Sequence, residues 1–260
     1  MSEFWEAIIK GMQRYQIIYD NVEKARGGFY MDTIENRKKG RVGQRYGPYK
    51  GFFNNDEYIS KSIDNLQEFS ELMLEVKKET NLILSKIGVK SKERIKEKSN
   101  NEYRGDVTKV KDIIRCTLIY TNNRNDDLVE GSLKKKFKLV EKKVQLSSKF
   151  DGYSGTIYRV KFSNGCYGEI QYNHAAMIYL KESKEDILKY YYSEDLWSSI
   201  DRISSVKSGL GHKMYEQIRV LEKKVKSKSI SREEISLLDR IKVLHSKYYS
   251  EFNNLLKNLK

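Results

Sequence analysis

The chain has 260 residues, enough to bury a hydrophobic core, and 38% of them are hydrophobic, with nineteen Tyr and nine Phe. This aromatic content excludes a wholly disordered chain, because disordered chains lack large apolar side chains. Fifty Lys and Arg against thirty-six Asp and Glu leave a net charge of +14. Such a charge favours polyanionic partners, although solvated Lys-rich helix faces would give the same composition.

The two cysteines, Cys116 and Cys166, both fall in segments with the composition of strands, and neither has a His or Cys at metal-ligand spacing. We therefore expect two reduced thiols in the core. The sequence begins with no apolar run of signal-peptide length and holds no apolar segment of about eighteen residues. These features predict a cytoplasmic protein without a membrane-spanning helix.

The first part of the chain, residues 1–87, has helical spacing on both sides of a basic loop. In the first segment the apolar side chains recur at Phe4, Ile8, Met12, Tyr15 and Tyr19. A second run, residues 62–88, is rich in apolar residues and is expected to be helical up to a C-terminus at Gly88. We expect a helical N-terminal region.

The basic loop, residues 37–50, combines glycines and the single proline with a cluster of cations. Tyr46 and Tyr49 interleave with Arg37, Lys38, Lys39, Arg41, Arg45 and Lys50. Cations that follow phosphates and rings that stack on bases are typical of a nucleic-acid surface. A disordered basic loop would have the same composition, so both interpretations stay open.

Residues 107–171 have the composition of strands. The segment VKDIIRCTLIYT is rich in β-branched residues, and KKFKLVEKKVQL is a charged strand or a short helix. The segments GTIYRVKF and CYGEIQY flank Asn164-Gly165, which predicts a hairpin with a type I′ turn. In the register set by that turn, Tyr158 and Val160 would share the strand face of Glu169.

Beyond residue 174 the sequence returns to helical spacing. Ser231 precedes Glu234 by three residues, which predicts a capping box at the start of a helix. The segment GLGHK, residues 209–213, is either a helix break or a phosphate-binding turn. We expect residues 186–260 to form helices that pack on a core of residues 88–185.

Two carboxylates lie in strands, where burying a charge is costly. Glu169 and Gln171 share one face of their strand by alternation, and Asp112 lies at the entrance of an apolar strand. Taken singly, Glu169 fits a solvent-facing edge strand and Asp112 fits a turn or cap. Together they match the oxygen ligands of a Mg²⁺-dependent phosphoryl-transfer site, in which both would be catalytic and metal-binding residues.

Cations suited to a polyphosphate lie just upstream. A helix is expected to begin near Ser91. On it Arg94 and Lys98 share a face, and Lys90 lies at the N-terminal end, where amide N–H groups favour an anion. A solvated Lys/Glu helix is the alternative. Arg115, in the following strand, is a further candidate for a phosphate.

In their order along the chain, the segments VKSKERIKEK, KVKDIIRCT, DGYSG and GEIQ resemble the synthetase domain of RelA/SpoT-type enzymes, which are nucleotide pyrophosphokinases. The resemblance spans residues 88–171. It implies an α+β fold of the nucleotidyltransferase-like type, with a mixed β-sheet flanked by N- and C-terminal helices. It also implies ATP as the pyrophosphate donor and Mg²⁺ as the cofactor, held by Asp112 and Glu169.

The same resemblance assigns roles to the other site residues. The segment that holds the ATP phosphates in that family corresponds to Lys90, Ser91 and Lys98. A Gly-Tyr loop whose tyrosine stacks on the acceptor purine corresponds to Gly152 and Tyr153. The Glu-x-Gln strand that supplies the second carboxylate corresponds to Glu169 and Gln171.

Four positions depart from the pattern of that family. Ile157 stands where a His is usual, Asn173-His174 where Arg-Thr is usual, and Thr117 where an Arg is usual. The chain therefore resembles the divergent phage and toxin-type members, whose acceptor is a purine nucleotide or the 3′ end of tRNA. We expect a growth-inhibiting toxin or phage-defence effector with an antitoxin or regulatory protein as partner. The alternative is a catalytically degenerate protein that binds nucleotide or nucleic acid.

Overall fold

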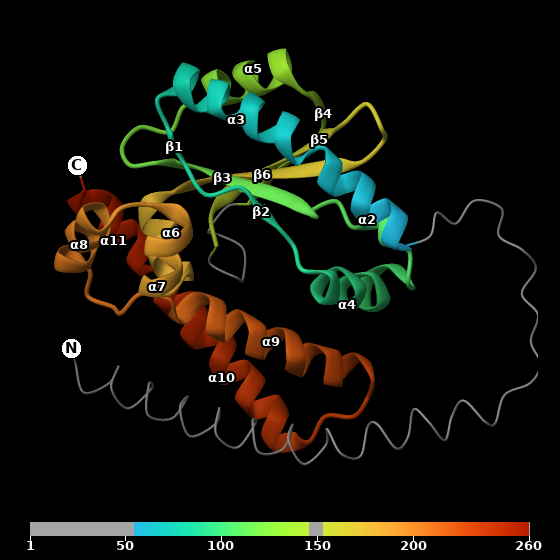
Figure 1. Ribbon diagram of the computed structural model, residues 1–260. Coiled ribbons are helices and arrows are strands. Elements are labelled where there is room, and N and C mark those ends of the chain that lie inside the picture. Colours follow the sequence, from blue (N-terminus) through green and yellow to red (C-terminus); the bar gives the residue numbers. More distant parts are fainter. Residues whose placement is uncertain (1–54, 146–152, 260) are drawn as a thin grey trace, which may run out of the picture. The chain divides into compact units, whose positions relative to one another are not determined.

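The computed structural model describes residues 55–145 and 153–259, so the predicted helix near Phe4 and the basic loop lie outside the described residues. The centre is a six-stranded mixed sheet with the order β1-β3-β6-β5-β4 and with β2 paired to β3 (Figure 1). Its strands are β1 (Ile83–Leu84), β2 (Gly88–Val89), β3 (Ile114–Tyr120), β4 (Lys138–Gln145), β5 (Gly155–Lys161) and β6 (Tyr167–His174). Strands β3 and β6 pair in parallel and the other pairs are antiparallel. The predicted α+β class with a mixed sheet is confirmed.

Helices lie on both sides of this sheet. Figure 1 shows α3 (Leu66–Thr80) and α5 (Asp126–Lys136) over one face, and α4 (Lys92–Tyr103) and α6 (Ala175–Lys181) on the other side. The remaining short elements are α2 (Asn55–Asp64), η1 (Val107–Lys109), α7 (Lys184–Asp186) and η2 (Ile187–Tyr191), a π-helical turn. The C-terminal helices are α8 (Glu194–Ile203), α9 (Leu210–Lys226), α10 (Arg232–Tyr249) and α11 (Glu251–Asn258). The predicted division of the chain at residues 88 and 186 stays a prediction.

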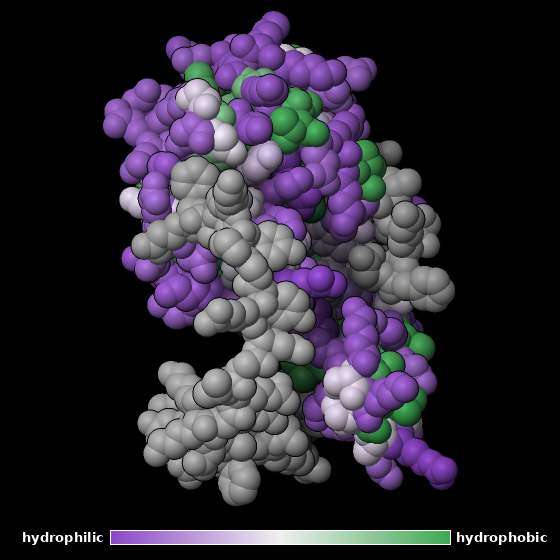
Figure 2. Space-filling model, turned by 90° about the vertical axis from the view of Figure 1, so that its right-hand side faces the viewer, coloured by the Kyte–Doolittle hydropathy of each residue, from purple (hydrophilic) through white to green (hydrophobic). Residues whose placement is uncertain are grey.

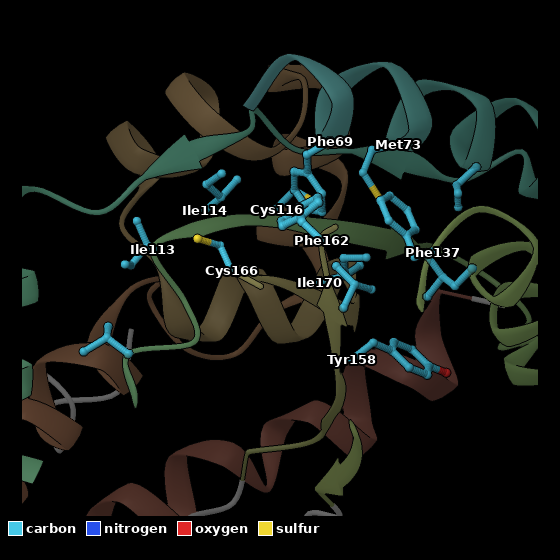
Figure 3. Packing of buried hydrophobic residues seen from close by; sticks show 14 of the residues in the cluster. Phe69, Met73, Ile113, Ile114, Cys116, Phe137, Tyr158, Phe162, Cys166 and Ile170 are labelled. Atoms are coloured by element: carbon cyan, nitrogen blue, oxygen red, sulfur yellow. The ribbon is translucent and has the colours of Figure 1, made fainter. Parts of the chain in front are cut away.

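The main hydrophobic core lies between the sheet and helices α3 and α5. Phe69 and Met73 of α3 and Ile170 of β6 are fully buried in it (Figure 3). The Phe69 ring contacts the rings of Phe137 and Phe162 at centroid distances of 5.7 and 5.9 Å. Aromatic and aliphatic side chains thus fill the space between helix and sheet, which leaves the opposite sheet face to polar residues.

Both cysteines are free and buried, as the sequence predicts. Cys116 lies in β3, whereas Cys166 lies in the loop just before β6 rather than within the strand. Burial raises the pKa of the Cys116 thiol, and the charge of Glu169 adds to that rise. A thiol with a raised pKa is a poor nucleophile, so Cys116 serves the packing of the core.

Helix α3 ends earlier than the sequence predicts. It stops at Thr80, and Asn81 adopts a left-handed conformation with a φ of 53°. Asn tolerates this conformation at a helix C-terminus. The apolar residues that follow form β1, in which Ile83 pairs with Ile119 of β3. The predicted continuation of the helix to Gly88 is therefore wrong, because these apolar residues belong to the sheet.

The hairpin of β5 and β6 turns through three residues instead of two. The Phe162 carbonyl accepts from Gly165 N–H at 3.0 Å, and Phe162 N–H donates to the Cys166 carbonyl at 2.9 Å. Gly165 has a φ of 88°, and Asn164 is not among the described residues with positive φ. A type I turn followed by a left-handed glycine gives this pattern, whereas a type I′ turn needs positive φ at both central residues. The predicted type I′ turn is wrong.

The extra loop residue changes the register of the hairpin by one position. Arg159 pairs with Glu169, and Tyr158 pairs with Ile170. Since a shift of one residue moves every side chain to the other face of a strand, Tyr158 and Val160 point into the core. The prediction that these two residues share the face of Glu169 is wrong. Glu169 shares its face with a guanidinium group instead.

The C-terminal helices join the sheet through α6, which follows β6 directly. The Tyr248 hydroxyl of α10 donates to the carbonyl oxygens of Leu180 and Lys207 at 3.0 and 2.7 Å. The predicted capping box at the start of α10 is confirmed, because Ser231 and Glu234 each accept from the backbone N–H of the other. The bonds of Tyr248 join α10 to the end of α6 and to the segment before α9.

The GLGHK segment forms the N-cap and first turn of α9. Gly209 has a φ of 79°, which a residue with a side chain rarely adopts. A Cβ atom at Gly211 would lie 2.9 Å from the Leu180 carbonyl oxygen, so the glycine permits close packing of α9 against α6. Both glycines are explained as helix-start and packing residues.

The surface is mainly hydrophilic. Figure 2 shows a face dominated by hydrophilic residues, with small separate hydrophobic patches. Among the exposed apolar side chains are Leu74 and Val243, at 56% and 66% exposure. In the part of the chain that the structure describes, no helix combines the length and apolar character that crossing a bilayer requires.

Replacement of Phe69 tests the position of the core. Phe69→Ala should lower the free energy of unfolding by about 3–5 kcal/mol, because it removes a fully buried ring and leaves a cavity. Leu74→Ala, on the same helix but exposed, should change it by less than about 0.5 kcal/mol. Urea denaturation followed by circular dichroism measures both values. Equal losses in the two variants would contradict this core.

Candidate active site

The predicted site residues gather on the sheet face opposite α3 and α5. Because Cys116 and Ile170 point into the core, alternation directs Arg115 of β3 and Glu169 and Gln171 of β6 to the opposite face. The apolar residues of each strand thus cover the core, and the intervening polar residues of the same strands form the site.

The connection from β2 to α4 brings the predicted phosphate-binding residues to this face. Lys90 N–H donates to the Ile113 carbonyl at 2.8 Å, which ties Lys90 to the segment that enters β3. Ser91 is the N-cap of α4, and its hydroxyl accepts from Arg94 N–H at 3.3 Å. The predicted helix start near Ser91 is confirmed. Lys98 follows one turn after Arg94 on the same helix.

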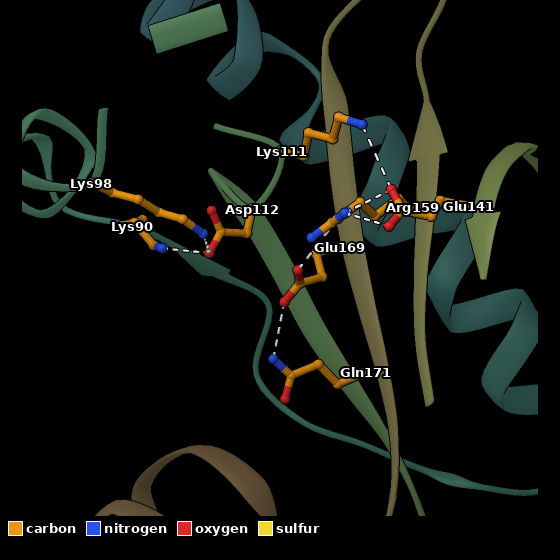
Figure 4. Close-up of polar contacts among 8 residues, drawn as sticks. All are labelled: Lys90, Lys98, Lys111, Asp112, Glu141, Arg159, Glu169 and Gln171. Atoms are coloured by element: carbon orange, nitrogen blue, oxygen red, sulfur yellow. Dashed lines mark hydrogen bonds and ion pairs between the residues drawn. The ribbon is translucent and has the colours of Figure 1, made fainter. Parts of the chain in front are cut away.

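Asp112 lies between two lysines in a nearly buried position, at 6% exposure. Its Oδ2 accepts from Lys90 Nζ at 2.5 Å and from Lys98 Nζ at 3.0 Å (Figure 4). Its Oδ1 is buried and has no hydrogen-bond partner. One oxygen of the carboxylate is therefore neutralised by two ammonium groups, while the other makes no hydrogen bond.

The Lys90–Asp112 pair changes the pKa of both groups. Burial raises the pKa of Asp112, but the charges and hydrogen bonds of Lys90 and then Lys98 outweigh it, and the pKa falls below its usual range. The pKa of Lys90 is also lowered, because burial of its ammonium group lowers the pKa more than the charge and hydrogen bond of Asp112 raise it. At neutral pH the carboxylate is ionised and ready to bind a cation.

Glu169 lies between two arginines of the neighbouring strands. In the sheet register it pairs with Arg115 of β3 and with Arg159 of β5. Its Oε2 lies 3.8 Å from Arg159 Nε, and its Oε1 accepts from Gln171 Nε2 at 3.0 Å (Figure 4). Arg159 is held in turn by Glu141, whose two oxygens accept from Nη1 at 2.7 and 2.6 Å. Gln171 therefore orients the Glu169 carboxylate.

Asp112 and Glu169 line one cleft of about 520 Å³, and Figure 4 shows both carboxylates on the same side of the sheet. The other predicted site residues in its walls are Lys90, Ser91, Arg94, Lys98, Arg115 and Gln171. Helix α9 supplies further lining residues, which are His212, Tyr215, Glu216 and Arg219. The structure thus brings together residues that are up to 81 positions apart in the predicted set.

A second cavity of about 470 Å³ adjoins the cleft. The two share the lining residues Val89, Arg94, Arg115, Gln171 and His212. Other walls of the second cavity come from α6 and η2 and include Lys181, Glu182, Tyr190 and Tyr191. Two compartments with a common boundary of cationic and amide side chains can hold two ligands side by side.

A half-buried ion pair lines the second cavity. Lys181 Nζ lies 3.0 Å from Glu182 Oε1, which also accepts from the Tyr191 hydroxyl at 3.3 Å. Burial alone would lower the pKa of Lys181, but Glu182 and the neighbouring tyrosines raise it. Burial alone would raise the pKa of Glu182, but Lys181 lowers it. Both groups are charged at neutral pH, which leaves a carboxylate at the cavity wall.

Tyr153 is not among the described lining residues of either cavity. Its hydroxyl donates to Asn173 Oδ1 at 2.8 Å, and Lys181 Nζ lies 5.8 Å from its ring centroid. Burial raises the pKa of the Tyr153 hydroxyl, against the opposing charge of Lys181. Gly152 lies outside the described residues. The stacking role of the Gly-Tyr loop stays a prediction.

Several residues of the site were not identified from the sequence. Arg159 is missed because the predicted two-residue turn puts Val160 opposite Glu169, whereas a three-residue loop predicts the pairing of Arg159 with Glu169. Tyr215 and Arg219 lie on one face of α9 by helical spacing, but the spacing does not say which neighbour that face contacts. Glu182 carries no signal in the sequence, because its place in the second cavity depends on the packing of α6.

The chain is similar in sequence to a known toxin. No family model matches the chain. The "(p)ppApp synthetase toxin Tas1" of Pseudomonas aeruginosa (strain UCBPP-PA14) is 36% identical over 141 residues, which are 54% of this chain and 31% of that protein. The chain thus spans less than a third of the length of the curated relative that it matches.

Solved structures of other proteins also match this chain. A crystal structure of the type VI effector Tas1 with its immunity protein matches at a TM-score of 0.62 and 27% identity, over 76% of this chain and 96% of that chain. The small alarmone synthetase 1 of Bacillus subtilis matches at a TM-score of 0.41 and 16% identity, over 78% of this chain and 97% of that chain.

In its fold and its polar cleft the chain resembles a RelA/SpoT-like domain, and both the predicted resemblance and the α+β class are confirmed. Within that class the similarity in sequence and in structure is to the toxin Tas1.

Removal of one lysine tests the charge balance at Asp112. Lys98→Met should raise the pKa of Asp112, because a cation 3.0 Å from Oδ2 is lost. Lys96→Met is the matched control, since Lys96 lies on the same helix and pairs with exposed Asp56 at 4.0 Å. Titration of the carboxyl carbons by NMR measures the pKa.

The sign of the pH dependence follows from the lowered pKa. The pKa of an Asp in an unfolded chain is about 3.9, and the pKa of Asp112 in the folded protein is lower. Its pairing therefore stabilises the fold above about pH 3.9, and this contribution is lost as the pH falls through the folded pKa. A Lys98→Met protein with an unchanged pKa at Asp112 would contradict the assigned pairing.

Proposed function

We propose that the chain is a Mg²⁺-dependent pyrophosphokinase that moves pyrophosphate from ATP to an adenine nucleotide and acts as a growth-inhibiting toxin. The observation that carries this proposal is the single cleft in which Asp112 and Glu169 lie together with Lys90, Lys98 and Arg115. Two carboxylates for a metal ion beside several cations for phosphates are the parts that phosphoryl transfer needs.

The two carboxylates suit Mg²⁺. Asp112 Oδ1 is a buried carboxylate oxygen without a hydrogen-bond partner, which is costly unless the oxygen binds a further ligand. The described residues contain no cluster of three or more His, Cys, Asp or Glu that could hold a metal alone. Mg²⁺ is usually held by one or two carboxylates and by substrate phosphates, so Asp112 and Glu169 suffice. When bound, the ion neutralises charge on the phosphates.

The two cavities suit a donor and an acceptor. The larger cleft has Lys90 and Ser91 at the N-terminus of α4, where backbone N–H groups and the lysine favour phosphates. We assign this cleft to ATP and the second cavity to the acceptor. Arg94, Arg115 and Gln171 line both cavities and mark the boundary at which pyrophosphate moves.

The transfer is a substitution at the β-phosphorus of ATP. The acceptor hydroxyl oxygen forms a bond to that phosphorus, and the bond to the oxygen that bridges to the α-phosphate breaks, so AMP leaves. Glu169 takes the proton from the hydroxyl group. Gln171 orients Glu169 through its amide, and Arg115 neutralises the charge that develops on the phosphates.

An adenine nucleotide as acceptor is supported by the similarity to Tas1, which is described as a (p)ppApp synthetase. The crystal structure of Tas1 contains its immunity protein, which supports a protein antitoxin as the partner of this chain as well. The basic loop that would favour tRNA lies outside the described residues, and the choice of an adenine nucleotide rests on the similarity to Tas1.

Two conservative substitutions test the catalytic roles. Asp112→Asn and Glu169→Gln should each lower the rate of pyrophosphate transfer by about 100-fold or more, because each removes a charged metal ligand or proton acceptor and keeps the side-chain shape. Asp64→Asn, at an exposed carboxylate of α2, should leave the rate unchanged. Transfer of label from γ-labelled ATP, resolved by chromatography, measures the rate.

The same assay identifies the acceptor when AMP, ADP, ATP, GDP, GTP and bulk tRNA are supplied separately. Label in adenine nucleotides is the expected result. Label in tRNA would change the acceptor class, and label in no acceptor would establish the alternative of a catalytically degenerate binding protein.

A further inference from the structure

We propose that Tyr215 and Arg219 of α9 form the platform on which the purine ring of the donor nucleotide stacks. This inference rests on the proposed function, because it assigns the larger cleft to a nucleotide. Among the described residues that line that cleft, Tyr215 is the only tyrosine, and it is 44% exposed. Most of the other lining side chains carry charges or amides, which suit phosphates and a sugar rather than a ring.

Arg219 holds the tyrosine in place. Its guanidinium carbon lies 5.8 Å from the centroid of the Tyr215 ring, within the range of a cation–π contact. Its Nη1 donates to Glu216 Oε1 at 3.2 Å, and its Nη2 lies 3.9 Å from Glu102 Oε1 of α4. The guanidinium thus contacts both helices that line the cleft and keeps the ring next to the cavity.

The position of Tyr215 along α9 fits the base of a nucleotide. His212 lines both cavities and therefore lies at the boundary where pyrophosphate moves. Arg219 follows seven residues later, about 10 Å further along the helix axis. Tyr215 and Arg219 line the larger cleft and not the second cavity, so they contact the donor side. A nucleotide whose phosphates bind Lys90 and Lys98 would therefore place its base near the distal part of α9.

The test compares two ligands that differ in the base. Tyr215→Ala should weaken binding of ATP roughly tenfold, because the base loses its stacking contact with an aromatic ring. Binding of inorganic tripolyphosphate should stay unchanged, because it has no base. Tyr215→Phe keeps the ring and should keep the ATP affinity. Isothermal titration calorimetry in the presence of Mg²⁺ measures the affinity of both variants and of the wild type for each of the two ligands.

The matched control is Val225→Ala, which removes an apolar side chain of similar exposure from the last turn of the same helix. It should leave both affinities unchanged. Thermal unfolding of each variant shows whether it is folded. An unchanged ATP affinity in Tyr215→Ala, or equal weakening of ATP and tripolyphosphate, would overturn the platform.

The platform and the proposed function fail in different ways. Wild-type protein that binds ATP through Tyr215 but transfers no pyrophosphate would overturn the proposed function and keep the platform. Wild-type protein that transfers pyrophosphate, with Tyr215→Ala at full ATP affinity, would overturn the platform and keep the proposed function.

Discussion

The buried carboxylate of Asp112, shared by Lys90 and Lys98, is the interaction on which the rest of the site depends. It joins three segments of the chain, which are the end of β2, the face of α4 and the entrance of β3. A charge at this depth is tolerated because both lysines neutralise one oxygen. The same geometry leaves the other oxygen without a partner, beside the cleft that Glu169 also lines.

The division of the sheet into two faces explains how one set of strands serves both packing and chemistry. Strand β6 turns Ile170 into the core and presents Glu169 and Gln171 to the cleft. The burial of Glu169 is possible because Arg115 and Arg159 lie on the strands at either side. Position by position, the core residues fix the register that places each charged residue beside its partner.

Much of this arrangement could be predicted from the sequence, because it depends on local patterns. Alternation around Glu169 predicted a strand with one polar face, the β-branched composition after Asp112 predicted another strand, and Ser91 predicted the start of α4. The register of the hairpin could not be predicted, because Asn164-Gly165 is compatible with a two-residue and a three-residue loop. That one residue decides whether Val160 or Arg159 lies opposite Glu169.

The contribution of α9 was also beyond the sequence, for a different physical reason. Helical spacing places Tyr215 and Arg219 on one face, but the packing of Gly211 and Tyr248 against α6 decides that this face borders the cleft. Contacts between elements distant in sequence depend on how whole helices pack. The second cavity, with its half-buried Lys181–Glu182 pair, depends on the same packing.

The shared metal site is the central claim, and a crystal soaked with Mn²⁺ and a non-hydrolysable ATP analogue tests it most directly. Mn²⁺ takes the same oxygen ligands as Mg²⁺ and can be located by its anomalous scattering. The account predicts one anomalous peak in contact with Asp112, Glu169 and the analogue's phosphates. A peak bound to other carboxylates, or phosphates bound with no metal at Asp112, would contradict it.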